Sequence, residues 1–139
     1  MAIGATITIA AAILLDERDR MLVVRKRGSA WFMQPGGKIE ASETPVEALR
    51  RELAEEVALD IDGVAEHGVF SAPAVNEAGA TVVAHIFSGR LTAMPRLGGE
   101  IEALDWVNPR APGALPLAPL TRDMLPLAER LMHHSGELR

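Results

Sequence analysis

The stretch 37–59, GKIEASETPVEALRRELAEEVAL, is the most informative part of this 139-residue chain. It predicts a helix from about Pro45 to about Val57, because Thr44 suits the N-cap, Pro45 suits the first helical position and Glu47 completes a capping box. Apolar residues recur along it at helical spacing and should face a core. They are Val46, Leu49, Leu53 and Val57.

The same helix carries a group of acidic residues. Glu52, Glu55 and Glu56 occupy positions i, i+3 and i+4, so their carboxylates share one face, which lies beside the apolar stripe. Like charges at this spacing repel one another, but clustered carboxylate oxygens are suitable ligands for a divalent cation such as Mg²⁺ or Mn²⁺. The alternative is a solvated acidic face paired with Arg50 and Arg51.

The residues around these glutamates match a known pattern. Gly37, Glu43 and the run 51–59 resemble the Nudix box, G-x5-E-x7-R-E-U-x-E-E-x-G-U, in which U is a bulky aliphatic residue. Every fixed position matches except Ala58, where the family has glycine. That glycine usually tolerates left-handed backbone at the helix end, so Ala58 should cost about 1 kcal/mol if the same geometry is kept.

The resemblance extends beyond the box. The segment 31–40 is similar to that of mutator-type nucleoside triphosphate pyrophosphohydrolases, and 100–107 resembles the E-I-x4-W-V segment of many Nudix enzymes. It implies a Nudix-type α/β/α sandwich with a central mixed β-sheet, with residues 1–139 as a single Nudix hydrolase domain. The order of elements, β-β-α-β-β-β-α, independently suggests a mixed sheet with a helix on each face.

The implied reaction is Mg²⁺-dependent hydrolysis of a nucleoside diphosphate linked to a group X, in the first instance a nucleoside triphosphate to monophosphate plus pyrophosphate. No Asn stands in the segment 119–122, where relatives selective for oxidised guanine carry one. ADP-ribose, nucleotide sugars and dinucleoside polyphosphates remain open as substrates. A nucleotide-sensing domain that binds without cleaving is the alternative from another functional class.

The resemblance also assigns roles in metal binding. Glu52, Glu55 and Glu56 match the metal ligands, and the carbonyl of Gly37 matches a further ligand. Arg51 matches an arginine that orients an acidic side chain.

Further residues are expected to pair with Arg51, to accept the proton of the attacking water and to bind the phosphates of the substrate. Glu43 is the expected partner of Arg51, through a bidentate ion pair. Glu56 or Glu52 within the box, or Glu100 after the two glycines 98–99, would accept the proton of the attacking water. The remaining phosphate charge would be neutralised by Lys38 and by one of three consecutive basic residues, Arg25, Lys26 and Arg27.

The rest of the chain reads as strands and one more helix. An apolar strand is expected from Ile3 to Ile13, and a second over 21–24 pairs back with it. A turn is expected at 35–37, and further strands over 64–74, 80–91 and 101–107. A loop over 108–119 precedes a closing helix over 121–133, in which Pro126 would cause an early kink.

Composition limits the environment and the partners. The net charge of −5 argues against a nucleic acid polymer as partner. The longest apolar stretch, 5–15, is too short to span a bilayer, so no membrane partner is expected. The absence of cysteine fits a reducing compartment, and we expect a cytoplasmic protein. Aliphatic residues in the segment 108–119 would permit a homodimer.

Overall fold

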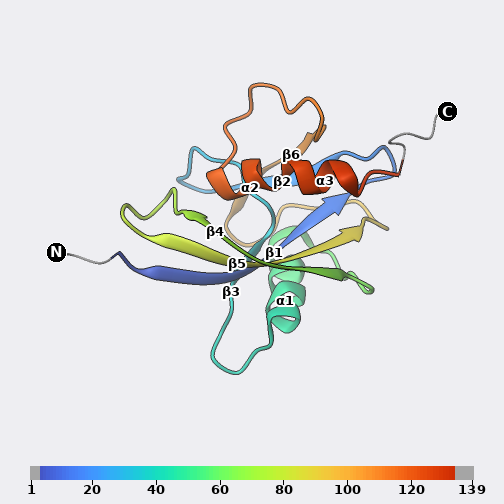
Figure 1. Cartoon of the computed structure of the whole chain (residues 1–139). Coiled ribbons are helices and arrows are strands. Elements are labelled where there is room, and N and C mark those ends of the chain that lie inside the picture. The colour runs from blue at the N-terminus through green and yellow to red at the C-terminus, as the bar shows by residue number, and fades with distance from the viewer. Residues whose placement is uncertain (1–3, 134–139) are drawn as a thin grey trace.

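The computed structural model describes residues 4–133, and a mixed sheet forms its centre (Figure 1). Its strands are β1 (Thr6–Leu15), β2 (Met21–Lys26), β3 (Gly36–Lys38), β4 (Ala65–Pro73), β5 (Thr81–Arg90) and β6 (Ile101–Val107). They follow the order β4-β5-β1-β2-β6, and β3 pairs with β1. Because β1 runs parallel to β5 while the other pairs are antiparallel, the predicted mixed sheet is confirmed.

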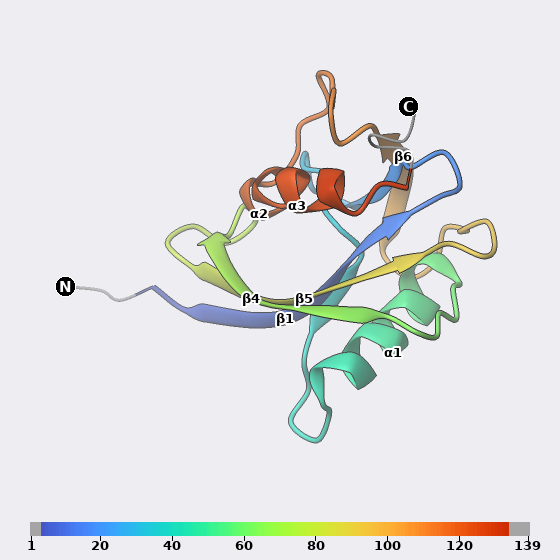
Figure 2. The same cartoon turned by 45° about the vertical axis from the view of Figure 1, so that its right-hand side comes forward.

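Helices cover both faces of this sheet. Helix α1 (Pro45–Val57) packs on one face, and α2 (Pro119–Asp123) with α3 (Leu125–Arg130) packs on the other, as Figures 1 and 2 show. This arrangement confirms the α/β/α sandwich. Within residues 4–133 no helix has the length and the apolar character that crossing a bilayer requires.

Strand β1 is the centre of both cores. Its side chains alternate between the two faces, as the period of two in a strand requires. Ala11, Ile13 and Leu15 join the core beneath α2 and α3, whereas Ala10, Ala12 and Leu14 join the core beneath α1. The predicted buried strand is confirmed from Thr6 onward, and Ile3 lies outside the described residues.

Helix α1 has the predicted bounds and the predicted cap. The hydroxyl of Thr44 accepts a hydrogen bond from the Glu47 N–H at 3.2 Å, and the Glu47 carboxylate accepts one from the Thr44 N–H at 2.9 Å. Leu49, Leu53 and Val57 are buried against the sheet. The rotation of the helix about its axis is therefore set by this apolar stripe.

The turn expected over 35–37 is wrong, because Gly36 and Gly37 belong to strand β3. Gly36 lies opposite Ala11 and Gly37 opposite Ala10 on β1. Gly36 has a φ of 148°, and a Cβ there would overlap the carbonyl oxygen of Ala10. The central strand therefore passes too close to Gly36 for a side chain at this position.

The closing helix expected over 121–133 is not continuous, and the kink predicted at Pro126 is a complete break. The chain forms α2 and α3, with Met124 between them. Pro126 has no N–H to donate to the carbonyl of residue 122, so a continuous helix would lack this bond. The Met124 N–H instead donates to the carbonyls of both Leu120 and Thr121, each at 3.1 Å, which tightens the chain at the break.

Replacing Ala58 by glycine should stabilise the protein. Ala58 ends α1 with φ 58° and ψ 39°, the left-handed conformation that glycine adopts without steric cost. We expect Ala58→Gly to raise the free energy of unfolding by about 1 kcal/mol, measured by urea denaturation in EDTA. Ala54→Gly, at an exposed site within the same helix, should lower it by about 1 kcal/mol. A loss of stability in both variants would contradict this interpretation.

Candidate active site

An acidic cleft of about 420 Å³ lies where α1, β3 and the loop before β6 meet. It is lined by Lys26, Gly37, Lys38, Glu40, Glu52, Glu55, Glu56, Gly99 and Glu100. The three glutamates of α1 lie beside the buried stripe of the helix, which confirms their expected place at the edge of a cleft. Segments far apart in the sequence thus bring five carboxylates and two ammonium groups to one cavity.

Glu56 is the buried carboxylate of the cleft. Its relative exposure is 6%, and one carboxylate oxygen accepts a hydrogen bond from the Gly36 N–H at 3.2 Å. Lys26 Nζ lies 3.9 Å from the other oxygen. Burial raises the pKa of Glu56 to about 7, against the lowering effects of Gly36 and Lys26, and the nearby Glu52 and Glu55 raise it further. Burial therefore disfavours the ionised form of Glu56 more than the nearby ammonium of Lys26 favours it.

Glu52 lies against the backbone of Gly37. A Cβ on Gly37 would overlap the carboxyl group of Glu52, so a side chain at position 37 would displace it. Arg51 Nη1 donates to Glu52 Oε2 at 2.8 Å and fixes the carboxylate from the other side. The first glycine of the box-like pattern therefore leaves room for the carboxylate of Glu52.

Arg51 connects the loop before α1 to the cleft. Its Nε and Nη2 donate to the two oxygens of Glu43 at 2.6 and 2.9 Å, which is the bidentate pair expected from the sequence. Nη2 also donates to the carbonyl of Lys38 at 3.0 Å. The hydrogen bond from Arg51 lowers the pKa of Glu43 to about 2, and Glu43 in turn raises the pKa of the guanidinium above its ordinary value. Arg51 is therefore a positioning residue for Glu52 and for the end of β3.

The loop before β6 brings Glu100 to the cleft. The Gly98 N–H donates to the carbonyl of Glu56 at 2.9 Å, and a Cβ on Gly98 would overlap the carbonyl of Glu55. The carbonyl of Glu100 accepts from the Arg27 N–H at 2.8 Å. These backbone contacts hold the loop against the end of α1. They place Glu100 on the wall of the cleft that also contains the glutamates of α1.

The donor set of the cleft fits a divalent cation. Carboxylates are the hard oxygen ligands that Mg²⁺ and Mn²⁺ prefer, and a cation would supply the charge that ionised Glu56 lacks. Within residues 4–133 no three acidic or imidazole side chains already stand together in a coordinating arrangement. Glu52 is held by Arg51, and Glu55 is 59% exposed with its carboxylate 3.5 Å from Arg51. Reorientation of these two side chains would accompany binding of a cation.

Only two of the four basic residues predicted to contact phosphate line the cleft. Lys26 and Lys38 line the cleft. Arg25 donates to Glu102 at 2.7 Å and to the carbonyl of Ser29 at 3.0 Å, and Arg27 contributes the backbone contact to Glu100. The structure therefore does not bring Arg25 or Arg27 to the cleft wall.

Two residues near the cleft were not singled out by the sequence. Glu40 lines the cleft. Side chains two residues apart in an extended segment point to the same side, so the prediction for Lys38 could have been extended to Glu40. Gln34 is buried at 5% exposure in the segment leading to β3. A polar residue between apolar Met33 and the Pro-Gly-Gly run could have indicated an inward-facing amide.

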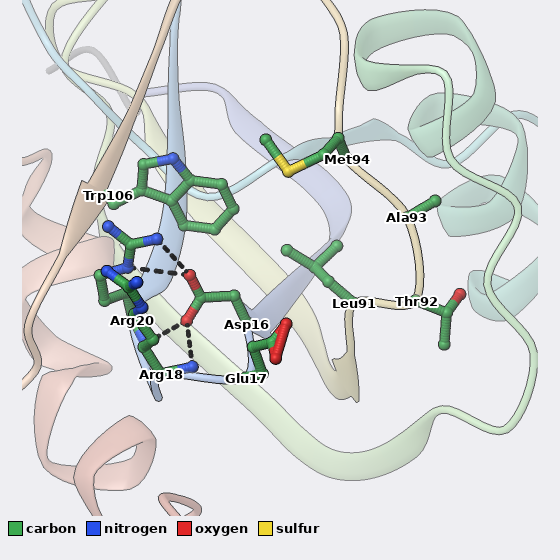
Figure 3. A pocket seen from close by; sticks show the side chains of 9 residues that line it. All are labelled: Asp16, Glu17, Arg18, Arg20, Leu91, Thr92, Ala93, Met94 and Trp106. Carbon is green, nitrogen blue, oxygen red and sulfur yellow. Dashed lines mark hydrogen bonds and ion pairs between the residues drawn. The ribbon is translucent and has the colours of Figure 1, made fainter.

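A larger cavity, of about 580 Å³, lies at the turn between β1 and β2 (Figure 3). Arg20 stacks over the ring of Trp106, 5.2 Å from its centroid, and donates to Asp16. Burial opposes ionisation of Asp16, but hydrogen bonds from the backbone and side chain of Arg20 outweigh it and lower the pKa. Because Asp16 and Arg20 already satisfy one another, we assign the chemistry to the smaller acidic cleft.

The sandwich fold and the cleft together define an α/β protein that can hold a divalent cation beside an anionic substrate. The family model of the NUDIX domain matches residues 6–128, and the chain belongs to this family of hydrolases. Enzymes of the family generally use divalent metal cations and act on small nucleotide substrates.

Individual relatives agree with this assignment. A Bacillus subtilis protein provisionally named 8-oxo-dGTP diphosphatase is 31% identical over 110 residues, which cover 78% of this chain and 68% of that protein. An RNA pyrophosphohydrolase of a Marinomonas species is 50% identical over 48 residues, which cover 34% of this chain and 30% of that protein. The crystal structure of a MutT protein from Methanosarcina mazei superposes with a TM-score of 0.78 at 23% identity, covering 94% of this chain and 98% of that chain. This last likeness concerns the fold.

Loss of the Glu43 carboxylate should remove an acid-sensitive part of the stability. The pKa of Glu43 is about 2 when folded and ordinarily 4.5, so its ionised form stabilises the fold above pH 4.5, and this contribution disappears as the pH falls toward 2. Urea midpoints of Glu43→Gln should lie below wild type at pH 7 and converge with it at acid pH. Asp62→Asn, which breaks the exposed pair with Arg50, should change little. A difference independent of pH would contradict the assignment.

Glu56 should have the opposite pH dependence in metal-free protein. Its folded pKa of about 7 exceeds the ordinary 4.5, so the stability falls as the pH rises through this interval. In EDTA at pH 8, Glu56→Gln should be more stable than wild type by up to about 3 kcal/mol, and the two should agree below pH 4.5. Addition of Mg²⁺ at pH 8 should stabilise wild type more than the variant. Equal urea midpoints at pH 8 in EDTA would contradict burial as the cause.

Proposed function

We propose that the chain is a Mg²⁺-dependent pyrophosphohydrolase that cleaves a nucleoside diphosphate linked to a group X, with nucleoside triphosphates as its main substrates and a nucleoside monophosphate and pyrophosphate as products. The observation that supports this most directly is the cleft itself. Buried Glu56, fixed Glu52 and exposed Glu55 lie there beside Lys26 and Lys38. Such a cleft is suited to a cation together with a polyphosphate.

The helix glutamates would hold the metal. Glu52, Glu55 and Glu56, with the backbone carbonyl of Gly37, are the proposed ligands. Bound Mg²⁺ supplies Lewis-acid chemistry and lowers the pKa of a coordinated water. Arg51 keeps Glu52 in place through its hydrogen bond at 2.8 Å, and Glu43 keeps Arg51 in place.

The other cleft residues would handle the phosphates and the proton. The ammonium groups of Lys26 and Lys38 would bind phosphate oxygens, and Lys26 already lies 3.9 Å from Glu56. Glu100, Glu52 and Glu56 are the candidates for accepting the proton of the attacking water. We favour Glu100, because a carboxylate that donates its electron pairs to a cation is a weak base, and Glu100 reaches the cleft from a separate loop.

The substrate is proposed at the level of a class. The Bacillus relative carries the name of an 8-oxo-dGTP diphosphatase and the Marinomonas relative that of an RNA pyrophosphohydrolase. Both names describe cleavage at a nucleotide phosphate chain, which supports the reaction. We propose a broad range of nucleoside triphosphates, with ADP-ribose, nucleotide sugars and dinucleoside polyphosphates as further members of the panel to be tested.

We also propose that residues 1–139 form a single Nudix hydrolase domain, because α1, β3 and the loop before β6 meet around one cleft. A cytoplasmic location and a homodimer remain predictions from the sequence, as do the exclusion of nucleic acid polymers and membranes as partners.

Turnover of a nucleotide panel tests the proposed function. With Mg²⁺, the protein should release pyrophosphate or a nucleoside monophosphate from at least one compound, and EDTA should stop this. Glu56→Gln should lower kcat by roughly 100-fold or more, since several kcal/mol of transition-state stabilisation depend on a correctly held cation. Glu47→Gln is the matched control: it makes the same change on α1 outside the cleft and preserves the capping box.

Other outcomes would identify the alternatives. Nucleotide binding without turnover across the panel would favour a sensing domain. Metal affinity that is independent of nucleotides would favour a metal-binding scaffold. Cleavage restricted to 5′-triphosphate RNA would overturn the exclusion of nucleic acid polymers.

A further inference from the structure

Strand β4 forms one edge of the sheet, and within residues 4–133 its only strand partner is β5. Thr81 on β5 lies opposite Pro73, and the Thr81 N–H donates to the carbonyl of Ala5 at 2.9 Å, so it points toward β1 and away from β4. Hydrogen-bonded and non-hydrogen-bonded pairs alternate along an antiparallel ladder. The backbone N–H and C=O groups of Val69 and Ser71 therefore point outward from the edge of the sheet.

Obstacles to further pairing stand only at the two ends of β4. The bulge between Glu66 and Gly68 interrupts the regular ladder at one end, and Pro73, which has no N–H, closes the other. Edge strands of monomeric proteins are usually protected by charged residues, prolines or bulges along their length. The stretch 69–72 between these obstacles reads Val-Phe-Ser-Ala, and Val69 is 54% exposed. A short, regular and uncharged edge is thus left accessible.

The sheet face beside this edge is also uncharged. Figure 2 shows α1 toward the other end of these strands, and the face that it leaves accessible has no Asp, Glu, Lys or Arg, although such residues make up 24% of the chain. Two copies of a chain with a net charge of −5 repel one another, so they can meet most easily where neither carries charge. This surface therefore suits a second copy of the chain. Its residues are Thr6, Thr8, Val69, Ser71, Pro73, Thr81, Val83 and His85.

We propose that β4 pairs antiparallel with β4 of a second copy, about a twofold axis at Phe70. A twofold interface uses the same surface on both copies. In this register Val69 exchanges backbone hydrogen bonds with Ser71 of the partner subunit, which satisfies the outward groups of both residues. An axis one residue later would place Val69 against Pro73, and an axis one residue earlier would place Ser71 against the bulge at His67.

Phe70 would strengthen this contact. Its ring is half-buried and packs against the core beneath α2 and α3. On the twofold axis the two copies of Phe70 form a non-hydrogen-bonded pair, in which side chains approach closely and aromatic pairs stabilise a sheet. An interface of one short strand is small, so we expect a dimer that dissociates on dilution. No residue of β4 lines the acidic cleft, so the inference does not rest on the proposed function.

Sedimentation equilibrium of the whole chain tests the dimer. Between about 1 µM and about 1 mM, wild type should change from monomer to dimer, as a small interface predicts. Val69→Lys should raise the dissociation constant by roughly 10-fold or more, because it places a charge on the paired edge. Thr6→Lys is the matched control, since it makes the same charge change on the same face but on β1, and it should leave the constant unchanged.

Two outcomes of this measurement would overturn the proposal. A wild type that stays monomeric over the whole range would leave the edge to an extended segment of a different protein. Equal weakening by Val69→Lys and Thr6→Lys would indicate that the sheet faces, and not the β4 edges, pack together.

Disulfide exchange tests the register, because the chain contains no cysteine of its own. Hydrogen-bonded partners in an antiparallel pair have Cα atoms about 5.5 Å apart, which suits a disulfide. Val69→Cys protein mixed with Ser71→Cys protein in a glutathione redox buffer should therefore form mainly the mixed disulfide. Both side chains are exposed, so the substitutions should preserve the fold. Preference for either homodisulfide would overturn the axis at Phe70, and the absence of any disulfide between chains would overturn the pairing.

Discussion

The packing of Leu49, Leu53 and Val57 against the sheet determines where the acidic residues of α1 point. These side chains are buried, so the helix cannot rotate about its axis without exposing them. The neighbouring face, with Glu52 and Glu56, is consequently held at the edge of β3. The capping box at Thr44 sets the start of the helix, and together these constraints position the carboxylates before any ligand arrives.

The position of α1 places a carboxylate, that of Glu56, where its negative charge is unfavourable. Glu56 is buried among other carboxylates, and its pKa is raised to about 7. Arg51 does not relieve this, because its guanidinium is engaged by Glu43, Glu52 and the carbonyl of Lys38. The buried position of Glu56 therefore lowers the stability of the metal-free protein, and a divalent cation would balance the negative charge of the carboxylates. A strongly shifted pKa of this kind is expected at a functional site.

Strand β3 borders both the acidic cleft and an apolar cavity, and its residues Gly37 and Lys38 line both. Its glycines lie flat against β1 and leave room for the carboxylate of Glu52 on the cleft side. Gln34, just before the strand, is among the residues that line the apolar cavity.

The sequence by itself determined α1, its caps, its buried stripe and the Arg51–Glu43 pair, because these depend on residues close together in the chain. It also predicted Lys38 and Glu100, through resemblance. Tertiary structure alone decided that Gly36 joins a strand, that Lys26 but not Arg25 reaches the cleft, and that the side chain of Gln34 is unpaired within residues 4–133. These features depend on which distant segments meet, and spacing along a chain carries no direct record of such contacts.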